Sequence, residues 1–434
     1  MAEGHARRTQ HDLAVDEPTA IRNVVLVGPG QSGKTTLVEA LLLASGAITR
    51  AGTVADGTTV TDHDEAEHAH QRSISLAVAP LVHAGTKINL LDTPGYADFV
   101  GEVRAGLRAA DCALFVLAAN ETVDDATRAL WRECGDVGMP RVVVVTKLDH
   151  ARADVDGVVA SAQAAFGDRV VPAFVFEDGA LTPLLTGDDA RRDALIEGVI
   201  EESEDEALME RYLDGQEVPE EVLLSDLEKA VARASFFPVV PVCAQTGVGC
   251  SELLDLMVRG FPSPLEHPSP EVFTPAGKAT GPVECDPHGP LVAEVVKTAS
   301  DPYVGRTSLV RVFSGALDPD LPVHVSGHLT SFLGAASGHE DHDEDEKVGS
   351  LAHPFGAAQV ATPRVVAGDI AVVGRLTRAE TGDTLSAVDR PRVLRPWTLP
   401  EPLLPVAIEA VTRSDEDKLS QALARLAAEE PSLR

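Results

Sequence analysis

A glycine-rich turn near the start of the chain has the residue types and spacing of a phosphate-binding loop. The residues from Gly28 to Thr35 fit the pattern Gly-x-x-x-x-Gly-Lys-Ser/Thr, between an apolar run that predicts a strand and a helical stretch at 36–44. Glycines in such a turn let successive backbone N–H groups surround a phosphate at the helix N-terminus. Lys34 is then placed to reach the β- and γ-phosphate oxygens, and the Thr35 hydroxyl to coordinate Mg²⁺. The predicted nucleotide contacts are Gly28, Pro29, Gly30, Gln31, Ser32, Gly33, Lys34, Thr35 and Thr36.

A second polar group, Asp-Thr-Pro-Gly, follows the apolar run 88–91. At the end of a neighbouring strand, Asp92 is placed to hold the metal through a water molecule, and the Gly95 N–H to sense a γ-phosphate. Asp-x-x-Gly is a weak pattern by itself, because Pro and Gly also form ordinary turns. Together with the glycine-rich loop, it predicts nucleotide contacts from Asp92, Thr93, Pro94 and Gly95.

The residues Thr-Lys-Leu-Asp at 146–149 directly follow a third apolar run. The Asp149 carboxylate can accept hydrogen bonds from the ring N–H and exocyclic amine of guanine, groups that adenine lacks, while the Lys147 stem packs along the base. The Cys243-Ala244 pair can add a backbone N–H to the guanine carbonyl. These positions predict GTP or GDP as the bound nucleotide and argue against an ATPase or small-molecule kinase. The predicted base contacts are Thr146, Lys147, Asp149, Cys243 and Ala244.

Apolar runs alternate with amphipathic stretches over residues 21–264, which is typical of βαβ units around a parallel sheet. We therefore expect an α/β P-loop domain at 21–264, with an acidic helical insertion near 176–228. Clustered prolines predict a linker at 265–280, and short alternating strands predict an all-β barrel at 281–395. Residues 1–20 are predicted to form a flexible tail. The expected buried strands are 23–27, 88–91, 113–117, 141–145 and 238–242.

Residues 396–434 supply only one predicted strand, 404–409, and one helix that opens at Ser414 with Asp417 in a capping-box position. One strand and one helix cannot bury a core of their own. We therefore expect the chain to stop inside an α+β third domain, either as a fragment or as a truncated protein.

The composition narrows the cellular setting. The 434 residues contain no uninterrupted apolar run near the roughly 20 residues that a membrane helix needs, and residues 1–20 lack the apolar region of a secretory signal. Five cysteines occur without a Cys-x-x-Cys pair, which suggests neither a disulfide framework nor a zinc site. We expect a soluble, monomeric protein in the reducing cytoplasm, with no membrane partner.

An excess of acidic residues limits the possible partners. The chain has 68 Asp and Glu residues against 36 Lys and Arg residues, a formal charge of −32. Such a surface repels nucleic-acid phosphates over most of its area, so DNA is not an expected partner and any RNA contact must be local. The acidity also suits a basic protein partner, or reflects the habitat or base composition of the source organism.

Together these motifs resemble elongation factor G, and more closely the EF-G-like second paralogue found in many bacteria. The resemblance covers nearly everything after Ala20. The matching segments are 51–57, 62–65 and 71–75 for the first switch, 98–99 and 102–104 for the second switch helix, 301–305, 311–315, 367–370 and 381–385 for domain II, and 405–409, 417–419 and 430–431 for the opening of domain III.

The resemblance assigns further roles to individual residues. Ser75 stands where the family has a Thr that ligates Mg²⁺, so the metal is expected on Thr35, Ser75 and Asp92. Thr146 replaces the usual Asn, with loss of an amide that braces the phosphate loop. Cys243 replaces the usual Ser, at a position where recognition is largely by backbone.

The largest departure from the family is Tyr96, which stands where a His helps to orient the attacking water when the ribosome stimulates hydrolysis. Tyr is bulkier than His and poorly suited to mimic an imidazolium. Loss of a water-positioning residue slows hydrolysis by about 10²–10⁴-fold without changing nucleotide affinity. We therefore predict Lys34 and Tyr96 as the catalytic positions, with intact GTP binding and slow or differently triggered turnover.

The resemblance implies a GTP-binding translation factor of the EF-G type, which hydrolyses GTP in connection with ribosomal RNA and ribosomal proteins. Two alternatives stay open. One is a GTP-binding regulatory or interaction module with little hydrolysis, and the other is a tetracycline-protection-type ribosomal factor. Translocation by EF-G depends on domains IV and V, which would follow Arg434, so this chain alone is not expected to translocate.

A histidine- and acid-rich run at 338–346 could bind a divalent metal, but it lacks a fixed ligand spacing such as His-Glu-x-x-His. We interpret it as a solvated loop of the β-barrel. His63, His68 and His70 are interpreted in the same way, as residues of an exposed loop.

Overall fold

The computed structural model describes residues 13–434 except 178, 186–190, 204–205, 215, 217, 302–304, 335–339, 402–404, 431 and 434. The chain divides into two compact units. One comprises 20–267 with 355–357, and the other comprises 268–354 and 358–434 with the described residues before Ala20. Outside the described residues lie parts of the expected tail and insertion, of the strand at 404–409, and of the segments 301–305, 338–346 and 430–431.

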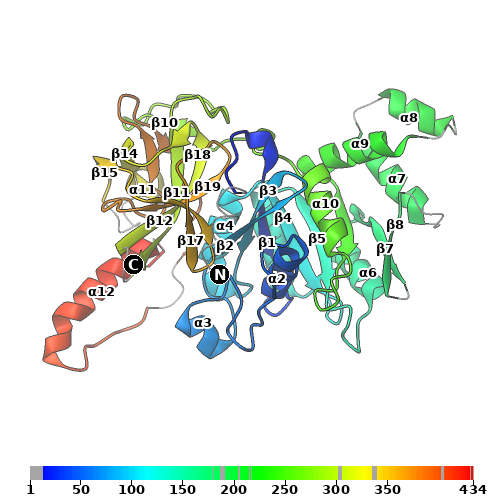
Figure 1. Ribbon diagram of the computed structural model, residues 1–434, viewed down its shortest axis with the longest axis horizontal. Helices are drawn as coiled ribbons and strands as arrows, with labels where there is room; N and C mark the ends of the chain where they lie inside the picture. Colours follow the sequence, from blue (N-terminus) through cyan, green and yellow to red (C-terminus); the bar gives the residue numbers. More distant parts are fainter. Residues whose placement is uncertain are drawn as a thin grey trace. The chain divides into compact units, whose positions relative to one another are not determined.

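The first unit is an α/β domain built on one sheet (Figure 1). Its strands are β1 (Ile21–Val27), β2 (Ala77–His83), β3 (Thr86–Asp92), β4 (Cys112–Ala118), β5 (Arg141–Thr146), β6 (Val170–Pro172) and β9 (Phe237–Pro241). The seven strands have the order β2-β3-β1-β4-β5-β9-β6, and every neighbouring pair is parallel except β2–β3. All the expected buried strands form, which confirms the α/β class, whereas β2 and β6 were not predicted.

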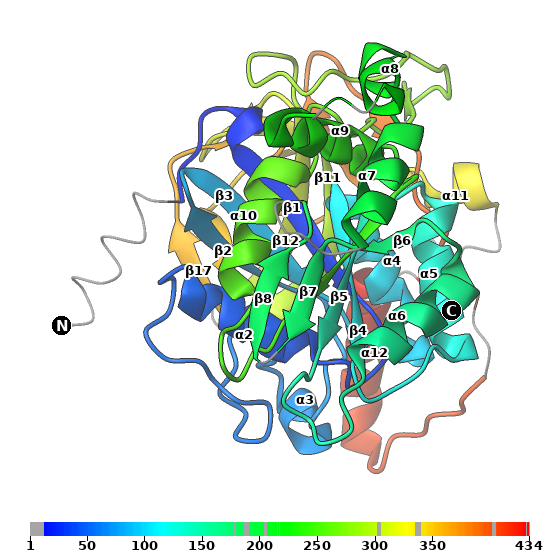
Figure 2. The same ribbon diagram turned by 90° about the vertical axis from the view of Figure 1, so that its right-hand side faces the viewer.

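Helices cover both faces of this sheet (Figure 2). The covering helices are α2 (Lys34–Ala44), α4 (Val100–Ala109), α5 (Asp125–Asp136), α6 (Val155–Phe166) and α10 (Cys250–Gly260). The short helix α3 (Glu65–His70) and the 3-10 turns at Pro18–Ala20 and Ala97–Phe99 are further elements of this part of the chain. On one face α2 and α10 share a continuous apolar core with strand residues such as Val24 and Leu114. On the other face the Phe115 ring contacts Trp131 of α5 and Phe166 of α6, with centroids 4.9 and 5.6 Å apart. The site therefore lies on a sheet that is packed on both sides.

The acidic stretch near 176–228 forms a small subdomain that contacts β6 through its first helix. Its elements are β7 (Phe174–Glu177), β8 (Ala180–Pro183), α7 (Arg191–Glu201), α8 (Glu206–Leu213) and α9 (Glu220–Ala232). Leu195 and Val199 of α7 and Leu227 of α9 are buried and join the main core. These helices are therefore amphipathic elements that extend the core, and not only a solvated acidic face.

The second unit is rich in β-strands, as the sequence predicts. Its elements are β10 (Val272–Phe273), β11 (Val292–Asp301), β12 (Gly305–Ser314), β13 (Ala316–Leu317), β14 (Pro322–Gly327), α11 (Leu329–Leu333), β15 (His342–Lys347), β16 (Leu351–Phe355), β17 (Ala358–Ala361), β18 (Val365–Val366), β19 (Ile370–Gly374), β20 (Thr384–Ala387) and β21 (Val393–Leu394). Eight strands form one sheet in the order β15-β14-β20-β11-β12-β19-β16-β17. Val295, Val310 and Leu385 contribute to its buried core.

Two interpretations of histidine-rich segments need correction. The described part of the run at 338–346 is not only a loop, because β15 pairs with β14 along its whole length, from Lys347 opposite Pro322 to His342 opposite Gly327. His63, His68 and His70 are exposed as expected, but the last two lie on α3 rather than in a loop.

The residues after 396 form one helix, α12 (Glu416–Glu429), preceded by a 3-10 turn at Arg413–Asp415. Two expectations are wrong here. The helix begins at Glu416 with Asp415 at its N-cap, and not at Ser414 as expected. The described residues of the strand expected at 404–409 are not in a strand, since no described strand pairs with them, and Val406 and Ile408 are exposed.

Candidate nucleotide-binding site

The carboxyl ends of β1, β3, β5 and β9 bring the predicted nucleotide contacts to one edge of the sheet, because parallel strands end on the same side. The loop after β1 turns sharply, with φ of 63° at Gln31 and 94° at Gly33. Gly28 lies so close to β4 that an added Cβ would be 2.3 Å from the Val116 carbonyl oxygen. Helix α2 begins directly after Gly33. This strand, loop and helix have the geometry that a phosphate cradle requires.

Lys34 lies inside the loop, and its side chain is buried. Its Nζ donates to the carbonyl oxygens of Gly28, 2.9 Å away, and Pro29, 3.0 Å away. Burial lowers the pKa of Lys34 to about 8, and the carboxylates of Asp92 and Asp62 oppose that shift. The ammonium group is therefore mostly charged at neutral pH and is already enclosed where a phosphate would bind.

Thr146, at the end of β5, braces the phosphate loop. Its Oγ1 lies 2.5 Å from the Ser32 carbonyl oxygen and 3.1 Å from that of Leu117. Thr146 lacks the amide of the usual Asn, but its hydroxyl reaches the loop directly. The Ser32 hydroxyl is buried and has no hydrogen-bond partner among the described residues. A buried polar group of this kind suggests a ligand that satisfies it.

Oxygen-bearing side chains meet beside the N-terminus of α2. Thr35 Oγ1 lies 3.2 Å from Ser73 Oγ, and Ser73 Oγ donates to Asp62 Oδ1 over 2.7 Å. Thr61 Oγ1 donates to Asp92 Oδ2 over 2.7 Å. The other oxygen of this carboxylate, Asp92 Oδ1, is buried without a hydrogen-bond partner in the described part of the chain. These five residues are called the oxygen group below.

The two carboxylates of the oxygen group are both disfavoured in their charged form. Burial and the nearby Asp92 carboxylate raise the pKa of Asp62 to about 6. Burial also raises the pKa of Asp92, against the hydrogen bonds of Thr61 and Thr35 and the charge of Lys34. A cation placed between these carboxylates would offset both shifts.

The oxygen group fits Mg²⁺, which prefers hard oxygen ligands. Asp92 Oδ1 is the unpartnered atom that such an ion would satisfy. Across the described residues no three His, Cys, Asp or Glu side chains gather as a metal site. A cation here would therefore also need oxygens from a nucleotide or from water, as is usual for Mg²⁺.

Sequence reasoning missed three members of the oxygen group, namely Thr61, Asp62 and Ser73. The predicted ligand Ser75 is half-buried, and Ser73 is the hydroxyl that lies beside Thr35. Their only signal in the sequence is the density of hydroxyl and carboxyl residues in the stretch that resembles a first switch. Ser75 stays a predicted ligand.

The residues after β3 divide between the core and the site. Thr93 is fully buried, and its Oγ1 donates to the Leu26 carbonyl oxygen over 2.6 Å, so its side chain joins β3 to β1 instead of facing a nucleotide. Pro94 is also buried. Gly95 approaches the phosphate loop closely, since an added Cβ would be 2.5 Å from both Gly30 N and Lys34 Nζ. Its backbone is therefore beside the predicted γ-phosphate position.

The predicted base contacts meet at the ends of β5 and β9, which are parallel neighbours. Cys243 Sγ lies 3.8 Å from Asp149 Oδ1, within hydrogen-bond range for sulfur. Lys147 has a positive φ of 57°, and it lines the same cavity as Lys34. Ala244 is half-buried and packs against the core. Two separate sequence motifs thus form one end of the site.

A cavity of about 210 Å³ extends between the phosphate loop and Lys147. Its charged lining residues are three cations, Lys34, Arg72 and Lys147, and one carboxylate, Asp62. The lining is thus locally positive in a chain whose formal charge is −32. This local excess suits a polyphosphate ligand.

Tyr96 lies over the phosphate loop. A Cβ added to Gly30 would be only 2.5 Å from Tyr96 Cζ, so the ring packs directly on that glycine. The Arg72 guanidinium lies 5.3 Å from the ring centroid. The two predicted catalytic residues, Lys34 and Tyr96, line the same cavity.

Comparison with known proteins places the chain in a family. The family model for the elongation factor Tu GTP-binding domain matches residues 19–263, and the model for elongation factor G domain III matches residues 399–434. The Elongation factor G-like protein of two Mycobacterium tuberculosis strains is 60% identical over 441 residues, which cover 96% of this chain and 62% of that protein. The chain belongs to the elongation factor G-like GTPases.

A solved structure from Thermus thermophilus matches this EF-G-like chain with a TM-score of 0.80 and 30% identity, over 96% of this chain and 62% of that one. The EF-G-like chain thus spans 62% of the length of these relatives. Among its described helices, none is long and apolar enough to cross a membrane.

Proposed function

We propose that this EF-G-like chain binds GTP with Mg²⁺ and hydrolyses it to GDP and phosphate in connection with the ribosome, in the cytoplasm. The observation that carries the proposal is the meeting of the phosphate loop, Asp92 and Asp149 at one edge of a single sheet. In this proposal the partners are ribosomal RNA and ribosomal proteins, contacted locally because the chain is strongly acidic.

Nucleotide binding follows from groups that are already in place. The backbone N–H groups of the loop and the N-terminus of α2 would surround the β-phosphate. Lys34 would exchange its contacts with the Gly28 and Pro29 carbonyl oxygens for phosphate oxygens. Asp149 would accept hydrogen bonds from guanine, and the neighbouring Cys243-Ala244 pair would add a backbone N–H. Ala244 is the proposed donor, because the Cys243 N–H already donates to the Val248 carbonyl oxygen. A charged and buried ammonium makes this exchange favourable, since it needs little reorganisation.

Thr35, Ser75 and Asp92 are the proposed holders of Mg²⁺; Ser73 lies beside Thr35 and donates to Asp62. When bound, the ion neutralises charge that develops on the β- and γ-phosphates. The residues themselves orient the nucleotide and exclude water from the loop. Asp92 does so from a fully enclosed position at the end of β3.

A direct test compares GTP turnover by the purified chain with and without bacterial ribosomes. The expected result is a higher turnover with ribosomes. An unchanged rate would count against the ribosomal part of the proposal. Nucleotide affinity is measured separately with a fluorescent GTP analogue, because binding and hydrolysis depend on different residues.

A second candidate function is a GTP-binding module that hydrolyses little. The observation in its favour is the packing of Tyr96 on Gly30, which places a bulky ring where a smaller imidazole is usual. Tyr96→His separates the two candidates. If ribosome-stimulated turnover rises by about 10²-fold or more in this variant, Tyr96 limits hydrolysis in the natural chain. If turnover does not rise, Tyr96 is not the limiting departure.

A further inference from the structure

Three residues from separate segments meet at the rim of the nucleotide cavity: Gly30 of the phosphate loop, Arg72 of the stretch before β2, and Tyr96 after β3. The Tyr96 ring occupies the space that a side chain at residue 30 would need, with Cζ at 2.5 Å and Cε1 at 2.8 Å from an added Cβ. Real Cβ atoms are not found so close to other heavy atoms. The ring can therefore lie here only because residue 30 is glycine.

The second contact of the ring is with Arg72. The guanidinium carbon lies 5.3 Å from the ring centroid, within the roughly 6 Å range of a cation–π interaction. The Arg72 side chain is exposed, and no ion pair with a carboxylate is found for it in the described part of the chain. The Tyr96 ring is thus the described group that this guanidinium contacts.

The arrangement lies beside Lys34, at the end of the cavity where the γ-phosphate is expected to bind. Arg72 and Tyr96 line the cavity together with Lys34 and Thr35. Gly95, directly before Tyr96, is so close to Lys34 that an added Cβ would be 2.5 Å from Nζ. The ammonium that reaches the terminal phosphates therefore lies next to the tyrosine that holds the guanidinium.

We propose that Tyr96 is a positioning residue that holds Arg72 against the γ-phosphate, so that this arginine distinguishes GTP from GDP. The inference rests on the proposed binding of GTP and deepens it. Guanidinium groups bind phosphate oxygens through paired hydrogen bonds, and GDP offers no γ-phosphate oxygens at this position. The face of the tyrosine ring, and not its hydroxyl, is the part that acts.

The test measures the affinity of the 434-residue chain for GDP and for a non-hydrolysable GTP analogue, by fluorescence titration. Arg72→Gln should weaken binding of the GTP analogue by about 10- to 100-fold, which is the usual range for a charged hydrogen bond. Its affinity for GDP should change by less than about 3-fold. Tyr96→Ala should show the same selective loss, because the guanidinium is then no longer held.

The conservative variants separate the ring face from the hydroxyl. Tyr96→Phe keeps the face and should bind both nucleotides as the natural chain does. The double variant Arg72→Gln with Tyr96→Ala should lose no more than Arg72→Gln alone, since the two residues act through one contact. Arg128→Gln is a matched control, because Arg128 pairs with Asp125 on the surface of α5.

Gly30→Ala provides a second route to the same conclusion. The added methyl group must displace the ring, so the GTP analogue should bind more weakly in the natural background. The same substitution should have little further effect when residue 96 is already alanine. A loss that is equal in both backgrounds would mean that Gly30 acts on the phosphate directly, and would overturn the proposed role of the ring.

Other outcomes would also overturn the inference. Equal losses for GDP and the GTP analogue would show that Arg72 does not contact the γ-phosphate. A loss in Tyr96→Phe as large as in Tyr96→Ala would assign the effect to the hydroxyl. These results are independent of the ribosome experiment, in which unchanged turnover counts against the ribosomal function but leaves a selective effect of Arg72 on GTP affinity standing.

Discussion

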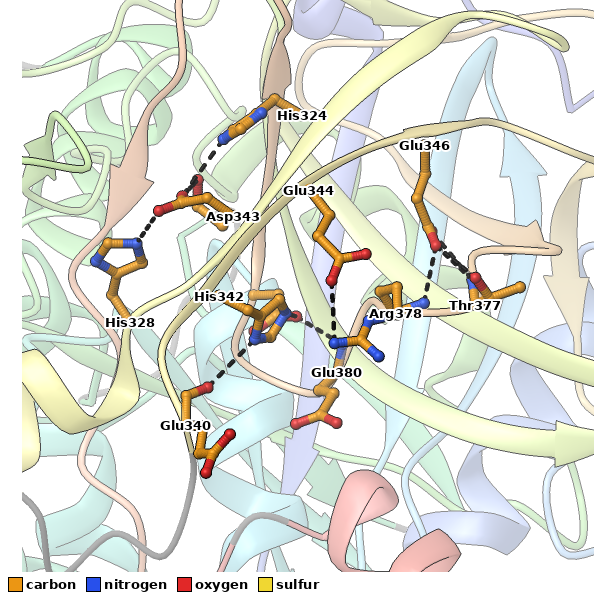
Figure 3. Close-up of polar contacts among 12 residues, drawn as sticks. His324, His328, Glu340, His342, Asp343, Glu344, Glu346, Thr377, Arg378 and Glu380 are labelled. Carbon is orange, nitrogen blue, oxygen red and sulfur yellow. Dashed lines mark hydrogen bonds and ion pairs between the residues drawn. The ribbon is translucent and has the colours of Figure 1, made fainter.

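Two groups of polar side chains in this chain both contain buried or clustered carboxylates but differ in how their polar atoms are satisfied. The first is the oxygen group with Lys34 at the nucleotide cavity. The second, called the β15 cluster, comprises the charged residues of β14 and β15 and of the segment 377–383 (Figure 3). The oxygen group contains a carboxylate oxygen, on Asp92, that is buried without a partner among the described residues.

Carboxylates of the β15 cluster have cationic or hydroxyl partners. Asp343 contacts His328 at 3.0 Å and His324 at 3.3 Å, and Glu344 contacts Arg378 at 3.0 Å. Most of these side chains are at least partly exposed. Exposed ion pairs contribute little to stability and need no further ligand.

The difference shows which feature points to binding. Acidic residues and histidines gathered in the sequence do not indicate a site, because a strand edge can satisfy them internally. A buried oxygen without a partner costs free energy in the protein alone, and a ligand can remove that cost. We therefore expect substitutions in the oxygen group and its neighbours to change nucleotide affinity, and matched substitutions in the β15 cluster to leave it unchanged.

The largest expected effect is that of Lys34→Ala. Removing the buried ammonium deletes charged hydrogen bonds to the β- and γ-phosphates, so the affinity for GTP and GDP should fall by about 100-fold or more. Arg378→Ala is the matched control, since it removes one cation from the β15 cluster. It should change affinity by less than about 2-fold. Titration with fluorescent nucleotides measures both, and similar losses in the two variants would remove the distinction between the groups.

The next effect is on the choice of base. Asp149→Ala should reduce the preference for GTP over ATP by about 100-fold or more, because the hydrogen bonds that select guanine are lost. Asp343→Ala removes a carboxylate from the β15 cluster and should leave the preference unchanged. Displacement of labelled GTP by unlabelled ATP is the measurement. If ATP displaces GTP equally well in the natural chain, the assignment of guanine is wrong.

A smaller effect is expected at the brace of the phosphate loop. Thr146→Val removes the hydroxyl that lies 2.5 Å from the Ser32 carbonyl oxygen. The loss of one neutral hydrogen bond, about 1 kcal/mol, should weaken binding of both nucleotides by about 5-fold. Thr146→Ser keeps the hydroxyl and should restore affinity. Thr377→Val makes the same deletion at a contact with Glu346 in the β15 cluster, and an equal loss there would contradict the role of the brace.

The sequence was sufficient for the parts of the site that depend on local patterns. The strands β1, β3 and β5 are near-continuous apolar runs, and the glycine spacing of the phosphate loop directly reflects its backbone geometry. Because parallel strands end at the same edge, the meeting of Asp92 and Asp149 was also predictable.

The remaining features depend on contacts between distant segments. Ser73 and Asp62 belong to the site only because the stretch before β2 folds back on α2. The antiparallel pairing of β2 with β3 has no counterpart in the alternating βαβ pattern. β15 has the sequence His-Asp-Glu-Asp-Glu-Lys, which no strand propensity favours, and it forms as an edge strand through its pairing with β14 and its ion pairs.

The smallest effect concerns stability, and it tests the β15 cluster directly. His342 Nε2 lies 3.0 Å from Asp383 Oδ2, and this hydrogen bond raises the pKa of His342 to about 9. Burial raises the pKa of Asp383, so the charged pair depends on the protonated imidazole. A raised histidine pKa contributes stability that is complete below the unfolded-state value near 6.5 and is lost as the pH rises through about 9.

The natural chain should therefore unfold at a temperature about 2–4 °C higher than His342→Gln at pH ~6, and this difference should shrink by pH ~10. Asp383→Asn removes the partner that raises the pKa of His342. In the Asp383→Asn background, adding His342→Gln should therefore change the unfolding temperature by the same amount at pH ~6 and pH ~10. Nucleotide affinity should be equal in all these variants at each pH, because the β15 cluster supplies no ligand group. If His342→Gln instead weakened GTP binding, the β15 cluster would be coupled to the nucleotide site although its polar atoms already have partners. The Asp92 oxygen that is unpartnered among the described residues would then no longer distinguish the nucleotide site from the β15 cluster.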